Sequence, residues 1–61
     1  MQQGPVVRKK RILVVDDEPG ATELAACYLE ARGLEVVQLN QPARALEVLR
    51  GGGFDLLIVD Y

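Results

Sequence analysis

The feature that most constrains the fold is a short apolar stretch that ends in three carboxylates. Residues 12–15 (Ile-Leu-Val-Val) are all apolar and mostly β-branched, and Asp16, Asp17 and Glu18 follow them directly. An unbroken apolar run is typical of a strand buried on both faces, because a half-exposed strand would alternate apolar and polar side chains. In open parallel α/β sheets, ligands bind beyond the carboxyl ends of such strands. The sequence therefore predicts an acidic group at the ligand-binding edge of a parallel sheet.

A helix and a second strand follow the three carboxylates. Apolar residues at helical spacing indicate an amphipathic helix over Pro19–Arg32, which Gly33 would end. Residues 34–39 predict the second strand, and their polar Glu35 and Gln38 indicate that it lies at an exposed edge. The apolar positions of the helix are Ala21, Leu24, Ala25, Tyr28 and Leu29.

A second helix is expected before the third strand. Asn40 or Gln41 would cap this helix, and Pro42 would lie in its first turn. The glycines at 51–53 would end it. Phosphate-binding glycine loops follow a strand and open a helix, whereas this run follows a helix, so we interpret it as a flexible connector. Residues 54–59 then form the third strand, which ends at an aspartate. The apolar positions of the second helix are Ala45, Leu46 and Leu49.

The order strand, helix, strand, helix, strand predicts two right-handed crossover units that share one parallel sheet. Because the most buried strand belongs in the middle, we expect strand order 2-1-3. This is the β-α-β-α-β half of a flavodoxin-like, doubly wound α/β sheet, truncated after its third strand. Strands 1 and 3 would be neighbours, so Asp16 and Asp17 would converge with Asp60.

Three converging carboxylates limit the chemistry of this edge. Neighbouring strands lie about 4.8 Å apart, so carboxylates at adjacent ends repel each other unless one takes up a proton or a cation enters. With oxygen ligands alone the fitting cation is hard, and Mg²⁺ suits a site with few protein ligands. A carboxylate beside such an ion can attack phosphorus, so the pattern permits an aspartyl-phosphate site. The alternative is that Asp16 or Asp17 caps the first helix and Asp60 begins a loop.

Composition excludes several other kinds of site. The chain has 61 residues, enough for one small domain, and its single cysteine cannot form an internal disulfide. It contains no histidine, which excludes histidine-ligated metals and histidine-based acid–base catalysis. The net charge is −2, and no segment has the apolar length of a signal peptide or membrane span. We expect a cytoplasmic protein without direct contact to nucleic acid or membrane.

Residues 1–10 are predicted to be a flexible basic leader. Four cations, Arg8 to Arg11, stand directly before the first strand. We interpret them as a solvated lead-in rather than a nucleic-acid or anionic-lipid contact, because the run is short and isolated. They belong to the end of the strand opposite the carboxylates and would not neutralise them.

Residues 12–18 before a helix, together with residues 54–60, resemble the first half of a response-regulator receiver domain. The resemblance covers residues 11–61 and implies a place in a two-component phosphorelay. It implies that Asp60 is the phosphoacceptor, phosphorylated by a sensor histidine kinase or phosphotransfer protein. It also implies that Asp17 and Asp60 ligate Mg²⁺, and that Asp16 does so through a water molecule.

The sequence also departs from this family. It ends one residue after Asp60, whereas receiver domains continue with a carbonyl metal ligand, a Ser or Thr and a Lys. We expect the 61-residue chain to be no enzyme and an incomplete domain with little phosphotransfer, its output domain or effector lying beyond residue 61. The third strand would be a bare edge through which the chain dimerises or aggregates. The alternative function is a receiver-like interaction module that is not phosphorylated.

Overall fold

The computed structural model of the chain describes residues 8–60. Residues 1–7, which hold most of the predicted leader, and Tyr61 lie outside the described residues. Within the described part, three strands and two α-helices alternate, and a short 3₁₀ turn precedes the second helix. In chain order the elements are β1 (Arg11–Val15), α1 (Pro19–Glu30), β2 (Glu35–Leu39), η1 (Pro42–Arg44), α2 (Ala45–Gly51) and β3 (Leu56–Val59).

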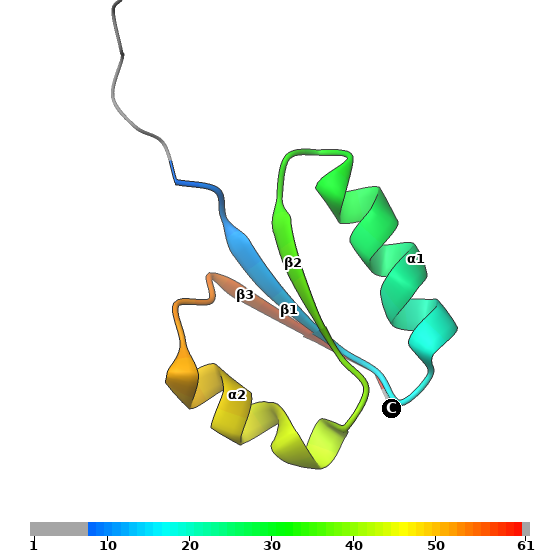
Figure 1. The fold of residues 1–61 in the computed structure, drawn as a ribbon, viewed down its shortest axis with the longest axis vertical. Helices are drawn as coiled ribbons and strands as arrows, with labels where there is room; N and C mark the ends of the chain where they lie inside the picture. Colours follow the sequence, from blue (N-terminus) through cyan, green and yellow to red (C-terminus); the bar gives the residue numbers. More distant parts are fainter. Residues whose placement is uncertain (1–7, 61) are drawn as a thin grey trace, which may run out of the picture.

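The three strands form one parallel sheet in the order β2-β1-β3, with α1 and α2 on its two sides (Figure 1). In the register of the sheet, Val15 lies beside Leu39 on one side and beside Val59 on the other. The predicted fold class and strand order are confirmed. All three strands point the same way, so their carboxyl ends meet at one edge of the sheet.

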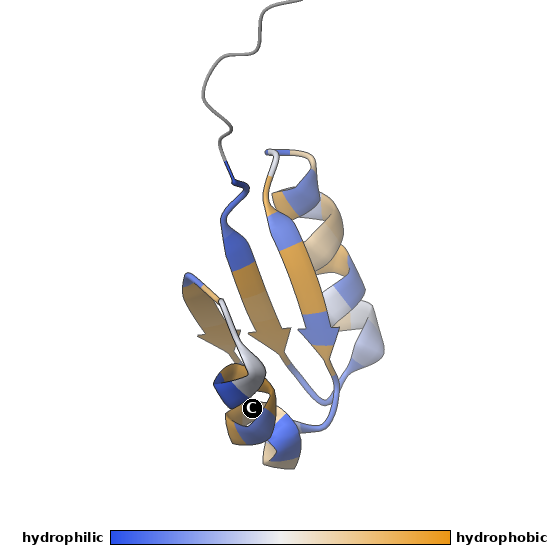
Figure 2. Cartoon of the chain, turned by 60° about the vertical axis from the view of Figure 1, so that its left-hand side comes forward, coloured by the Kyte–Doolittle hydropathy of each residue, from blue (hydrophilic) through white to orange (hydrophobic). Residues whose placement is uncertain are grey.

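The core of the molecule is the central strand. The four residues 12–15 of β1 are each at most 4% exposed, because neighbouring strands flank them and a helix covers each face. Burying an aliphatic side chain of this size contributes about 1.5–3 kcal/mol, so β1 is the main source of hydrophobic stabilisation. Figure 2 shows the apolar middle of β1 between the two outer strands.

Helix α1 buries a narrower face than the sequence predicts. Its buried residues are Thr22 and Ala26, whereas Leu24 is 74% exposed and Tyr28 is 58% exposed. The reason is the position of the helix, which packs on β2 and β1 rather than over β3. The prediction that Leu24 and Tyr28 pack in the core is therefore wrong. The helix also ends two residues earlier than predicted.

The outer elements are more exposed than their apolar sequences indicate. All four residues of β3 are 38–54% exposed, because within residues 8–60 this strand pairs on one side alone. Helix α2 has no buried residue among those described, and Leu46, predicted to face the core, is 61% exposed. The prediction that β2 is an exposed edge strand is confirmed.

Arg11 holds the amino end of the sheet together. Its Nη1 donates to the Gly52 carbonyl at 2.8 Å, its Nε donates to Glu35 at 3.0 Å, and its guanidinium lies 4.7 Å from the centre of the Phe54 ring. Gly53 has a φ of 81°, and a Cβ there would lie 3.2 Å from the guanidinium. Two residues of the glycine run thus lie against Arg11: the Gly52 carbonyl accepts its hydrogen bond, and Gly53 leaves room for its guanidinium. Arg11 is part of the fold rather than of a solvated lead-in.

Candidate acidic site at the carboxyl end of the sheet

The candidate site lies where β1 and β3 end. Asp16 and Asp60 directly follow Val15 and Val59, which are register partners on adjacent strands. The Asp60 amide donates to the Val15 carbonyl at 3.0 Å, and the Asp16 amide donates to the Leu39 carbonyl at the same distance. The backbone ladder therefore extends one residue past each strand and holds Asp16 and Asp60 side by side.

Asp16 is fixed in the turn from β1 to α1. It is 8% exposed, and its Oδ1 accepts a hydrogen bond of 2.9 Å from the Glu18 amide. This bond from a carboxylate to the amide two residues on stabilises a tight turn. The helix N-cap is Glu18, which makes no side-chain capping bond. The alternative interpretation was that Asp16 or Asp17 caps the first helix. Asp16 does stabilise the start of α1, although neither Asp16 nor Asp17 is the cap residue.

Asn40, which follows β2, connects this strand to the turn after β1 and to helix α1. Its Nδ2 donates to the Asp16 carbonyl and to Thr22 Oγ1, both at 2.9 Å. Thr22 is fully buried, and its hydroxyl donates in turn to the Pro19 carbonyl at 3.0 Å. Asn40 thus ties the end of β2 to β1 and α1. Of the two residues predicted to cap the second helix, Asn40 and Gln41, it is Gln41 that occupies the N-cap position of η1, and its side chain makes no capping hydrogen bond.

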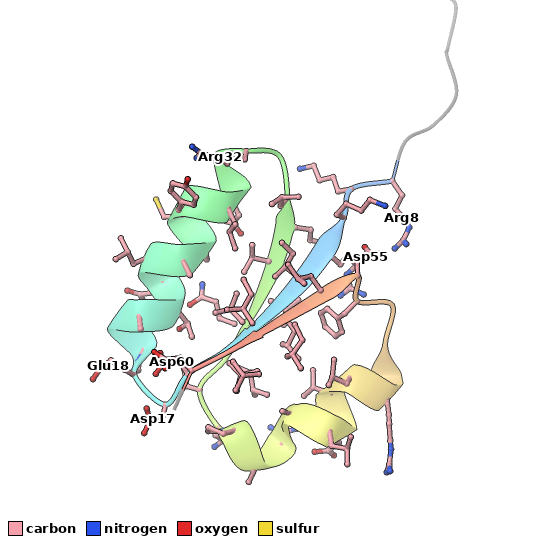
Figure 3. The ribbon with its side chains drawn as sticks, turned by 180° about the vertical axis from the view of Figure 1, so that it is seen from behind. Arg8, Asp17, Glu18, Arg32, Asp55 and Asp60 are labelled. Carbon is pink, nitrogen blue, oxygen red and sulfur yellow. The ribbon has the colours of Figure 1, made fainter. Side chains whose placement is uncertain are left out.

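The remaining carboxylates of the site are exposed to solvent. Figure 3 shows Asp17, Glu18 and Asp60 at one end of the sheet and Arg8 and Asp55 at the other. Within residues 8–60, no three carboxylate or thiol side chains are placed together in a way that would hold a metal ion. The structure therefore brings the predicted residues to one edge of the sheet, with Asp16 buried and hydrogen-bonded and with Asp17 and Asp60 exposed, but among the described residues it does not place three of them around one point.

The donor set fits a hard cation. It consists of carboxylate oxygens alone, which suit Mg²⁺, and two of its members, Asp17 and Asp60, are exposed to solvent. Lys9 and Lys10 precede β1 at the opposite end of the sheet, so they do not neutralise these carboxylates. The arrangement places the exposed Asp60 carboxylate beside the buried Asp16 at one edge of the sheet.

Asp55 belongs to a different environment at the amino end. The Arg11 amide donates to its Oδ2 at 2.8 Å, and Arg8 Nη2 lies 3.9 Å from its Oδ1. The hydrogen bond from Arg11, aided by the positive charges of Arg8, Lys10 and Arg11, lowers the pKa of the Asp55 carboxyl below its ordinary value of 3.8. This carboxylate is engaged in the fold and lies outside the candidate site.

Comparison with known proteins gives a similarity that bears on function. The chain is 38% identical over 52 residues to the CAI-1 autoinducer sensor kinase/phosphatase CqsS of Vibrio cholerae. The matched stretch covers 85% of this chain and 8% of that protein. No family model and no solved structure matches the chain. Within residues 8–60, neither helix has the length and apolar character needed to cross a membrane. The similarity thus links this open parallel α/β chain to a protein of two-component signalling.

Proposed function

We propose that this chain carries the phosphoacceptor site of a two-component receiver module in the cytoplasm, with Asp60 as the acceptor. The observation that supports it most is the pairing of Asp16 and Asp60 at the ends of adjacent parallel strands, with Asp17 exposed beside them. The similarity to a sensor kinase/phosphatase supports the same class of signalling. In this role the chain is a substrate of a kinase or phosphotransfer protein and has no catalytic turnover of its own.

The carboxylates have different tasks in this proposal. Asp60 is exposed, so one of its oxygens can attack the phosphorus of a phosphohistidine, which breaks the phosphorus–nitrogen bond and forms a mixed anhydride. Asp17 and Asp60 would hold Mg²⁺, with Asp16 acting through a water molecule. The ion would offset negative charge on the phosphoryl group. The buried, hydrogen-bonded Asp16 keeps one carboxylate at a fixed place in the site.

Among the described residues, the hydroxyl and ammonium groups of the kinds that the receiver family uses do not lie at this site. The chain contains no serine, and its single threonine, Thr22, is buried and bonded within α1. Its two lysines, Lys9 and Lys10, precede β1. Without a cation or a free hydroxyl from these residues beside Asp60, we propose that the 61-residue chain binds Mg²⁺ weakly and accepts a phosphoryl group slowly.

The test is to incubate the chain with Mg²⁺ and a small acyl phosphate, then reduce with borohydride. This reduction converts an aspartyl phosphate to homoserine, which peptide mass spectrometry locates. We expect little label, all of it on Asp60, and the same trace in Asp55→Asn, because Asp55 lies at the opposite end of the sheet. Label on another carboxylate, or label that persists in Asp60→Asn, would refute the assignment. Stoichiometric labelling would refute the expected weak competence.

The exposed apolar side chains favour a second candidate function, an interaction module that works without phosphorylation. Leu24, Tyr28 and the four residues of β3 are all exposed. A module of this kind would bind its partner equally well after Asp60→Asn. A phosphoacceptor module would lose its phosphorylation-dependent binding with the same substitution, which distinguishes the two functions.

A further inference from the structure

The peptide bond between Asp16 and Asp17 links the two carboxylate residues that directly follow β1. Its carbonyl oxygen, which belongs to Asp16, accepts a hydrogen bond of 2.9 Å from Asn40 Nδ2. The Asp16 amide donates to the Leu39 carbonyl at 3.0 Å, so the chain at the end of β2 holds both the amide and the carbonyl of Asp16. Because a peptide group is planar, an anchored one restrains the backbone dihedrals on either side of it. Asn40 therefore restrains the directions in which the Asp16 and Asp17 side chains leave the turn.

The partners of the Asn40 amide fix its orientation. The Asp16 carbonyl can only accept a hydrogen bond, so the nitrogen of the Asn40 amide faces it. The same nitrogen donates at 2.9 Å to Thr22 Oγ1, whose own hydrogen goes to the Pro19 carbonyl at 3.0 Å. Both hydrogens of the Asn40 amide are therefore engaged, and the fully buried Thr22 gives the amide a fixed second contact. A carboxylate at this position would make neither bond, because it has no hydrogen to donate.

The two carboxylates on either side of this peptide differ in their surroundings. Asp16 is buried and its Oδ1 accepts the bond from the Glu18 amide, which leaves Oδ2 for a cation or its bound water. Asp17 is exposed, so the direction of its side chain depends on the backbone of the turn. Groups that already hold their bound direction lose less conformational freedom on binding. The peptide that Asn40 anchors therefore affects how well both side chains can serve one ion.

We propose that Asn40 is a positioning residue of the acidic site, which anchors the peptide between Asp16 and Asp17 and thereby raises the affinity of these carboxylates for Mg²⁺. The inference rests on the proposed function, because it concerns the same cation. Asn40 acts through the backbone and does not itself contact the ion. Removing a side chain that holds metal ligands in place typically lowers metal affinity by about 10–100-fold. Because Asn40 holds the backbone rather than a ligand atom, we expect an effect at the lower end, about tenfold.

The test is the dissociation constant of the full chain for Mg²⁺, measured from the backbone amide shifts of Asp16, Asp17 and Asp60. Asn40→Ala should raise this constant by about tenfold. The matched control is Gly53→Ala, which destabilises the chain through a φ of 81° beside Arg11, at the opposite end of the sheet. It should change the constant by less than about twofold, because distant sites act independently. Both substitutions leave the net charge unchanged. If Asn40 were merely structural, Asn40→Ala would lower stability, as the control does, and leave the affinity of the folded chain unchanged.

The outcomes separate this inference from the proposed function. If Mg²⁺ binds the unaltered chain and Asn40→Ala equally well, or if both variants weaken binding equally, the positioning role is overturned while the proposed function stands. If Mg²⁺ does not bind the unaltered chain at the acidic site, the proposed function fails and the inference fails with it. If circular dichroism shows that Asn40→Ala is unfolded, the side-chain amide signals of the unaltered chain decide. Mg²⁺ should shift the two amide hydrogens of Asn40 and leave those of the exposed Gln38 in place, and equal or absent shifts would overturn the proposal.

Discussion

Asn40→Ala should destabilise the turn that carries the acidic site while leaving the charge of the site unchanged. The Asn40 amide nitrogen makes two hydrogen bonds of 2.9 Å, one to the Asp16 carbonyl and one to the buried Thr22 hydroxyl. Each such bond has a net contribution of about 0.5–1.5 kcal/mol. Their loss should therefore lower the free energy of unfolding by about 1–3 kcal/mol.

This loss is large for so short a chain. At about 0.05–0.15 kcal/mol per residue, 61 residues give a total free energy of unfolding of about 3–9 kcal/mol. The substitution should therefore remove a measurable share of the stability. For a domain of this size each kcal/mol lowers the melting temperature by about 4–8 °C. Because Asp16 also loses an anchor, Mg²⁺ binding should weaken in the same variant.

The assay is urea denaturation followed by circular dichroism at one fixed protein concentration, because association would shift the apparent stability. Gln38→Ala is the matched control, since it truncates an exposed amide on β2, two residues before Asn40, and should change stability by less than about 0.5 kcal/mol. Thr22→Val removes the second partner, and combined with Asn40→Ala it should be clearly less than additive. If Asn40→Ala is no more destabilising than the control, the proposed link between the three elements is wrong.

The remaining predictions concern the amino end of the sheet. Arg11→Lys keeps the charge but loses the planar fork, and should lower the free energy of unfolding in urea by about 1 kcal/mol, whereas an equal effect of Arg8→Lys would contradict this role. Since the folded pKa of Asp55 is lowered, its contribution to stability is complete above pH 3.8 and is lost as the pH falls below that value. An NMR titration giving a pKa of 3.8 or higher would contradict this. Gly53→Ala should destabilise the chain by about 1–2 kcal/mol because of its positive φ, whereas Gly51→Ala, in open space at the end of α2, should not.

The central strand and its acidic end could be predicted because their signal is local. An unbroken apolar run before Asp16 is compatible with few structures other than a central parallel strand, and residues 12–15 are indeed buried. The strand order then follows from the handedness of the crossovers and from burial. The exposed edge position of β2 was predictable for the same reason, since Glu35 and Gln38 are polar.

Burial of the outer elements could not be predicted in the same way. Helical spacing identifies Leu24 and Tyr28 as members of one apolar stripe, but it does not show whether the surface opposite is wide enough to cover them. Here α1 lies on β2 and β1, so this side of the helix remains open. The composition of β3 is likewise that of a buried strand, although its environment is that of an edge.

Polar contacts between distant segments left no local signal. Asn40 follows a strand and lies two residues before Pro42, a position that fits a helix cap as well as it fits the observed bonds to Asp16 and Thr22. Arg11 stands in a run of four cations, and nothing in that run distinguishes the one that binds Gly52. In both cases the partner lies at least 18 residues away in the sequence.

The most direct test of the central claim is an NMR titration of the chain with Mg²⁺, in which every backbone amide is followed. The account predicts weak, saturable shifts centred on Asp16, Asp17 and Asp60, abolished by Asp60→Asn and retained in Asp55→Asn. Shifts centred on Asp55 and the amino end of the sheet, or shifts at the acidic site that persist in Asp60→Asn, would contradict it.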